Sequence, residues 1–154
     1  MKQLTLIIVI YLFISCQKKV QIEKSVISKD QIEKSFISFE FRSLNIAENF
    51  IIKYNGGDTI YLKRIYPKEE NLLSVLTQNE KKDLIESLKK SNFNYSRNYW
   101  NNSVDDGQIY EFHIEHLDKT KDSILVHEEI GPKKLYDLAK KMNDLLDKKK
   151  FENK

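Results

Sequence analysis

Residues 50–65 read FIIKYNGGDTIYLKRI, with two strand-like segments on either side of a glycine-rich turn. Residues 50–54 and 59–65 are rich in the β-branched and aromatic side chains that strands favour. The tetrapeptide Asn55-Gly56-Gly57-Asp58 is typical of a tight hairpin, because asparagine and glycine accept the left-handed backbone angles of such turns. Pro67 ends the second segment, since proline has no amide hydrogen to donate to a neighbouring strand. The sequence therefore predicts an antiparallel hairpin here.

Three further strands are predicted outward from this hairpin. In residues 37–42, apolar side chains alternate with polar ones, which is the period of a strand with one buried face. Residues 108–117 show the same alternation, and residues 123–128 follow them after a charged turn at 118–121. Short links without a helix favour antiparallel neighbours over parallel crossovers.

Two helices are predicted. The first begins at Thr77-Gln78-Asn79-Glu80, a capping box in which the threonine and glutamate side chains each pair with an amide of the first turn. The second begins at Gly131-Pro132, where proline at the first helical position loses no hydrogen bond. Its apolar residues recur three and four apart and form one stripe, which indicates a face packed on the core.

These elements predict an α+β fold with the order β-β-β-α-β-β-α. We expect an antiparallel sheet of about five strands, with the two helices packed on one face. Residues 36–150 are long enough for one domain and too short for two comfortable ones.

The N-terminus predicts export. Residues 4–14 form an apolar run after a single basic residue, and the small residue Ser15 and the only cysteine of the chain, Cys16, follow it. The run is about half the length that a membrane-spanning helix needs. Its layout is that of a secretory signal peptide. The segment resembles a bacterial lipoprotein signal, which implies a signal peptide at 1–15 and a diacylglycerol on the Cys16 thiol.

The segment 16–35 predicts a tether. Residues 21–28 read QIEKSVIS and residues 31–38 read QIEKSFIS, a ten-residue duplication with one difference over these eight positions. Two copies are too few for a solenoid. We interpret the duplication as a lengthened link between the lipid and the folded residues, where insertions cost little.

Composition suggests a bacterial group and excludes one class of partner. The chain has little alanine and arginine, and it contains three short motifs: Asp106-Gly107-x-x-Tyr110-x-Phe112, Ser123-Ile124-x-Val126 and Gly131-Pro132-x-x-Leu135-Tyr136. With these features and its lipoprotein signal, the chain resembles the small uncharacterised envelope lipoproteins of Bacteroidetes-type bacteria that have an α+β domain. The resemblance implies an outer membrane lipoprotein, and the absence of acidic residues at 17–19 favours the periplasmic face. The net charge of +3 is spread among both signs, so we expect no nucleic-acid partner.

Catalytic signals are weak. We expect no catalytic residue, no metal site and no cofactor. The alternative is a small periplasmic hydrolase or metal-dependent enzyme that uses His113 and His127. These two histidines would face one another if the turn placed Ile114 beside Val126, and imidazoles beside a carboxylate can hold zinc.

The aromatic segment 93–102 is the candidate binding site. Tyr95, Tyr99 and Trp100 lie among asparagines, and aromatic faces beside amides suit a protein or a glycan partner. The alternative is that Phe93 and Trp100 fold back over the core. The sequence thus favours a membrane-anchored, non-catalytic binding or interaction module. One version is an immunity-type protein that holds an incoming toxin at the membrane.

We predict that Cys16 becomes the mature N-terminus and carries lipid. Each buried methylene contributes about 0.8 kcal/mol, so several acyl chains would hold the protein on a membrane almost permanently. Intact-mass analysis should show an acyl increment on the wild-type chain and none on Cys16→Ser. A wild-type mass without that increment would contradict the prediction.

Overall fold

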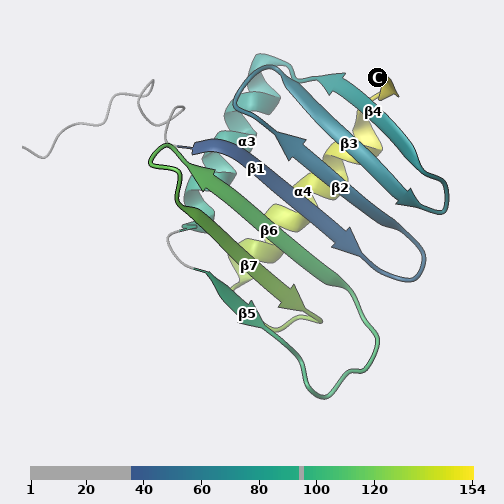
Figure 1. The fold of residues 1–154 in the computed structure, drawn as a ribbon, viewed down its shortest axis with the longest axis vertical. Helices are drawn as coiled ribbons and strands as arrows, with labels where there is room; N and C mark the ends of the chain where they lie inside the picture. The colour runs from purple at the N-terminus through teal and green to yellow at the C-terminus, as the bar shows by residue number, and fades with distance from the viewer. Residues whose placement is uncertain (1–35, 94–95) are drawn as a thin grey trace, which may run out of the picture.

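The computed structural model describes residues 36–93 and 96–154. The predicted signal peptide at 1–15, the lipidation site Cys16 and the tether at 16–35 lie outside the described residues. Within those residues the chain forms one sheet and two helices (Figure 1). None of the described helices is long and apolar enough to cross a membrane.

The structure is α+β, as predicted, but its sheet has eight strands instead of about five. The strands are β1 (Phe36–Leu44), β2 (Asn49–Tyr54), β3 (Thr59–Tyr66), β4 (Glu70–Val75), β5 (Arg97–Tyr99), β6 (Ile109–His116), β7 (Lys121–His127) and β8 (Glu152–Asn153). Their order in the sheet is β5-β7-β6-β1-β2-β3-β4-β8. The five predicted strands are therefore its centre, and the three strands that the sequence did not predict lie toward its edges.

The pairing is mixed. Every neighbouring pair is antiparallel except β5 and β7, which run parallel with Arg97 opposite Ile124 and Tyr99 opposite Val126. This pair corrects the expectation of a purely antiparallel sheet. The long connection through helix α3 (Gln78–Ser91) brings the chain back from β4 to the other edge, so β5 arrives in the parallel sense.

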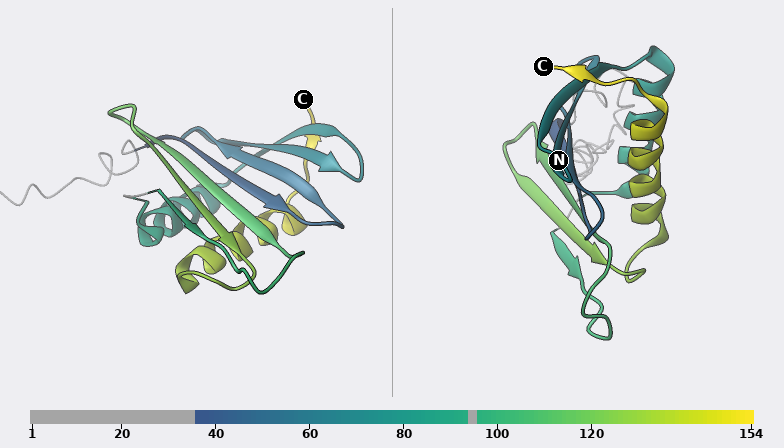
Figure 2. Two further views of the ribbon diagram at one scale, coloured as in Figure 1. Left: turned by 60° about the horizontal axis from the view of Figure 1, so that its bottom comes forward. Right: turned by 90° about the vertical axis from the view of Figure 1, so that its right-hand side faces the viewer.

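The two helices cover the same face of the sheet, as Figure 2 shows. Helix α3 has the predicted capping box, with both the Thr77 and the Glu80 side chains engaged. Helix α4 (Lys133–Lys148) begins one residue later than predicted, with Pro132 as its N-cap. No helix of residues 36–93 and 96–154 covers the opposite face of the sheet, which we call the outer face.

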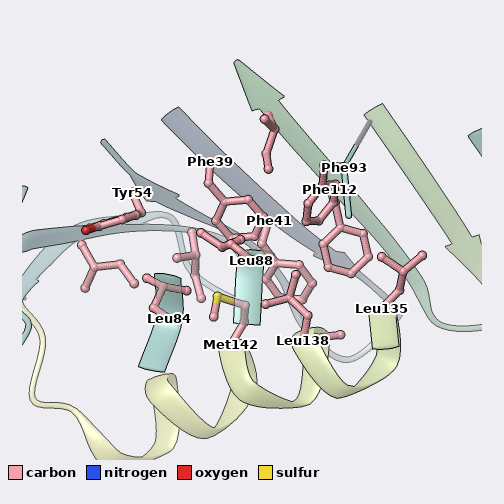
Figure 3. Packing of buried hydrophobic residues seen from close by; sticks show 14 of the residues in the cluster. Phe39, Phe41, Tyr54, Leu84, Leu88, Phe93, Phe112, Leu135, Leu138 and Met142 are labelled. Carbon is pink, nitrogen blue, oxygen red and sulfur yellow. The ribbon is translucent and has the colours of Figure 1, made fainter. Parts of the chain in front are cut away.

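The core lies between the sheet and the helices (Figure 3). Phe39 and Phe41 of β1 and Phe112 of β6 are fully buried, and Leu138 and Met142 of α4 pack toward them. Burying one such side chain stabilises a fold by about 1.5–3 kcal/mol. The alternation read from the sequence therefore gives the correct buried face for the central strands.

Glu80 joins the two helices. Its carboxylate accepts hydrogen bonds from the Thr77 amide at 2.7 Å, the Thr77 hydroxyl at 2.9 Å and Nζ of Lys149 at 2.6 Å. The hydrogen bond from Lys149, followed by that from the Thr77 amide, lowers the pKa of Glu80 below its ordinary 4.5. The start of α3 is thus tied to the residue that follows α4.

We predict that this contact makes stability depend on pH. Because the folded state lowers the pKa of Glu80, its contribution is fully present above the unfolded pKa and is lost as the pH falls through the folded value. Glu80→Gln should lower the free energy of unfolding at pH 7 by less than about 1 kcal/mol, the usual range for a pair near the surface. Denaturation curves should show this deficit shrinking below pH 4.5. Glu86→Gln, an exposed change on the same helix, is the control and should cause no pH-dependent loss of stability. If the loss of stability caused by Glu80→Gln stays the same in acid, the proposed role of Glu80 is refuted.

Candidate binding site

The predicted aromatic site is split by the sheet. Tyr95 lies outside the described residues. Tyr99 and Trp100 are consecutive at the end of β5, so their side chains point to opposite faces. Phe93 is buried in the core at 4 % exposure, whereas Trp100 is 49 % exposed. Of the two proposed core lids, Phe93 alone has that role.

Tyr99 lies on the helix side of the sheet. It sits opposite Val126 in the parallel ladder and packs against the buried core. The guanidinium carbon of Arg97 lies 5.0 Å from the centre of the Tyr99 ring. Tyr99 and Trp100 therefore do not form one recognition surface.

Trp100 lies over His127 on the outer face. The two ring centres are 4.2 Å apart and the ring planes are tilted by 32°. His127 directly follows the buried Val126, so it points away from the core, yet it is only 1 % exposed. The Trp100 ring thus shields His127 from water on the outer face.

A pocket of about 260 Å³ opens beside this pair. Its floor is a row of paired residues across four strands: His127 of β7 faces Ile109 of β6, which faces Leu44 of β1, which faces Asn49 of β2. The β5–β6 loop contributes a wall with Trp100, Asp105 and Asp106, and the β1–β2 loop contributes Asn45 and Ile46. We call this site the Trp100 pocket.

Hydrogen bonds hold both loops in place. Oδ1 of Asn45 accepts from the amides of Ala47 and Glu48, at 2.8 and 2.6 Å, which forms a local turn. Nδ2 of Asn45 donates to Oε1 of Gln108 at 2.6 Å, and Nε2 of Gln108 donates to the carbonyl of Leu44 at 3.2 Å. The Asn45 and Gln108 side chains therefore join the β1–β2 loop to the β5–β6 loop.

The end of β7 holds the β5–β6 loop. The Glu128 carboxylate accepts from the Gln108 amide, and the Glu128 carbonyl accepts from Nδ2 of Asn101 at 3.3 Å. Gly107 gives the Glu128 side chain room to approach, because a Cβ at that position would overlap it and force it to move. Glu128 and Glu129 both have positive φ, at 44° and 58°, which is unusual for residues other than glycine. This strained turn sits directly after His127.

Two buried polar atoms of the pocket floor lack a hydrogen-bond partner among the described residues. They are Oδ1 of Asn49 and Nδ1 of His127. A buried polar atom left unpaired costs about 1–3 kcal/mol, so folded proteins rarely keep two in one place. The strands β1 and β6 lie between Asn49 and His127, so the two atoms are separate features of the pocket floor.

The register separates His113 from His127 and corrects the expectation that they face one another. Ile114 is opposite Asp122 instead of Val126, and His113 is opposite Ser123. The hairpin turn is centred earlier than expected, because Oδ1 of Asp118 accepts from the amide and hydroxyl of Thr120.

On β6, His113 therefore lies four positions from Ile109, the partner of His127. At about 3.4 Å per residue, this places the two histidines roughly 13 Å apart along the strands. His113 instead contacts Glu111, with Nε2 at 3.2 Å from a carboxylate oxygen. In the part of the chain that the structure describes, no three His, Cys, Asp or Glu side chains are grouped to hold a metal ion.

No protein-family model, curated protein or solved structure matches the chain. The chemistry of the site is therefore argued from its own residues. Of these, sequence reasoning found Trp100 but missed the roles of Asn49 and His127. The position of His127 directly after the apolar run 124–126 was a signal that it could be buried. Its contact with Trp100 could not be predicted, because that contact depends on β5, a strand that the sequence did not predict.

We predict that Trp100 contributes little to stability compared with Phe93. Phe93→Ala empties a buried aromatic site and should cost about 3–5 kcal/mol. Trp100→Ala removes a ring that is already half in water, so it should cost less than about 2 kcal/mol. Chemical denaturation of the two variants measures both losses. An equal loss would show that Trp100 is held for stability and not for binding.

Proposed function

We propose that this protein is a membrane-anchored envelope lipoprotein whose folded part is a non-catalytic interaction module. The observation that carries the proposal is the Trp100 pocket, where a half-exposed indole stacks on the buried His127 at the open end of four strands. Exposed tryptophan is a common anchor of protein interfaces, because it buries a large apolar area and retains one donor. Loops on a rigid sheet are also the usual place for recognition.

The anchor comes from the sequence. Cys16 at the end of the apolar run would receive the lipid, and residues 16–35 would tether the folded part to the membrane. We place the protein in the outer membrane, on its periplasmic face, as a small lipoprotein of the Bacteroidetes type. Capture of a diffusing partner at the membrane surface suits this arrangement, and an immunity-type protein that holds a toxin is one version of it.

The enzymatic alternative has no observation in its favour within the described residues. His113 binds Glu111 on the outer face, and His127 lies under Trp100 in a different part of the sheet. His116 pairs with Asp122, with 2.9 Å between Nε2 and Oδ2. Each of the three histidines thus contacts a different residue.

We predict that a partner contacts the Trp100 end of the sheet. Ile46, at the pocket rim, is 82 % exposed, and Val75, at the opposite end of the strands, is 63 % exposed. A photocrosslinking residue at position 46, introduced in the cells that naturally make the protein, should give a discrete adduct that Trp100→Ala removes. The same residue at position 75 is the matched control and should give no adduct that depends on Trp100.

Identical adducts from both positions would contradict the proposal. So would an adduct at position 46 that is indifferent to Trp100→Ala. The stability of Trp100→Ala, measured as above, shows whether its loss of adduct reflects lost contact or lost folding.

A further inference from the structure

We propose that Asn55 is a modification site, at which the side-chain amide is converted to a carboxylate by deamidation without an enzyme. The site lies in the turn between β2 and β3, where Gly56 directly follows Asn55. This turn is at the opposite end of β2 from the Trp100 pocket, so the inference does not depend on the proposed interaction module.

The reaction joins the side chain to the next backbone nitrogen. The Gly56 nitrogen loses its proton and attacks Cγ of Asn55. A C–N bond forms, the bond from Cγ to the side-chain nitrogen breaks, and ammonia leaves behind a five-membered imide ring. Water then opens either side of the ring, which gives aspartate or an isoaspartate whose backbone continues through the former side chain. One water enters and one ammonia leaves, so the reaction needs no other reactant.

Glycine after asparagine favours this attack. Asn55 is the only asparagine of the chain that precedes a glycine. A residue without a Cβ leaves the attacking nitrogen unhindered and lets the backbone rotate more easily. The turn itself explains why glycine is used here, because Gly56 has a φ of 79°, in the left-handed region. The geometry of the hairpin therefore places the reactive pair in the chain.

The structure leaves this pair accessible. Asn55 is exposed, and apart from chain neighbours no atom lies within 4 Å of the place where a Cβ would be on Gly56. Among the described residues, neither the Asn55 side chain nor the Gly56 amide has a hydrogen-bond partner. Asn102 is exposed as well, but the Ser103 amide that would attack it donates to Oδ1 of Asn101 at 3.0 Å. Asn102 is therefore the matched comparison within the same chain.

The product changes the charge beside the turn. Asn55 lines a pocket of about 440 Å³ on the outer face together with Lys53, Lys63 and Lys154, and no acidic residue is among the described residues of its lining. Either product adds a carboxylate to this lining. The charge of the pocket thus falls by one when Asn55 is converted.

The isoaspartate product also lengthens the backbone of the turn. Tyr54 and Ile60 pair across the hairpin, and both are fully buried. The Asp58 carbonyl accepts from the Leu76 amide at 2.7 Å, which ties the turn to the start of α3. Since both sides of the turn are held, we expect the longer backbone to destabilise the hairpin. The aspartate product keeps the native backbone and should have little effect on stability.

Peptide mass spectrometry tests the proposal on the full chain, incubated in detergent micelles at mildly alkaline pH. We expect Asn55 to be converted at least about tenfold faster than Asn102, to a mixture of aspartate and isoaspartate peptides. The rate should rise with pH, because base removes the Gly56 amide proton. Asn55→Gln keeps the amide and the charge but would need a six-membered ring, so position 55 should stay unconverted in this variant.

The consequence for stability is measured on the same samples. Denaturation curves should show a loss of stability in the incubated wild-type chain that grows with its isoaspartate content. Asn55→Gln, incubated in parallel, should show no such loss, and freshly purified Asn55→Asp should be about as stable as the fresh wild-type chain. An equal loss in the wild type and in Asn55→Gln would refute the effect on the hairpin.

Two results would overturn the modification site itself. The first is conversion of Asn55 no faster than that of Asn102. The second is a rate in the folded chain that is lower by on the order of tenfold or more than the rate in guanidinium chloride, because folded structure would then protect the turn. Similar rates in the folded and denatured chains support the proposal, since they show that the hairpin leaves Asn55 open to attack.

Discussion

The alternation of side chains along β1 is the constraint on which the rest of the structure depends. Phe39 and Phe41 are fully buried on the helix side, and the alternating residues Glu40 and Arg42 point to the outer face. Since β1 is paired on both sides, with β2 and β6, it sets the register for the central strands. A slip of one residue would put both phenylalanines in water and both charges in the core.

No helix among the described residues covers the outer face. At the centre of this face, paired charged side chains interact well with water. Lys53 and Arg42 each lie 2.6 Å from the Glu40 carboxylate. Burial raises the pKa of Glu40, but the hydrogen bonds from Lys53 and Arg42 outweigh this and hold it below its usual range. The carboxylate therefore stays ionised at neutral pH and keeps the centre of the face polar. The unpaired polar atoms of this face that the structure describes lie instead at the end beside Trp100.

Sequence reasoning succeeded where one strong local signal was enough. Alternation gave β1 and β6, the glycine-rich turn gave β2 and β3, and the capping box gave α3. It failed for β4, β5 and β8, which are short or lack clear alternation and gain their hydrogen bonds from a neighbour already in place. The position of His127 was missed because a hairpin register depends on the turn, and Asp118 moved that turn. Trp100 was found, but its separation from Tyr99 follows from a strand of three residues.

The location of the Trp100 pocket follows from the same architecture. The four strands of its floor end together, so two loops and one strained turn meet where the ladder stops supplying hydrogen bonds. Backbone strain at Glu128 and Glu129 and unpaired atoms at Asn49 and His127 both oppose folding. They persist because the large core on the other face stabilises the chain independently of this end. A fold that keeps its stability on one face and its unsatisfied groups on the other can bind a partner without rebuilding its core. This division is the physical reason for our proposal that a partner contacts the Trp100 end of the sheet.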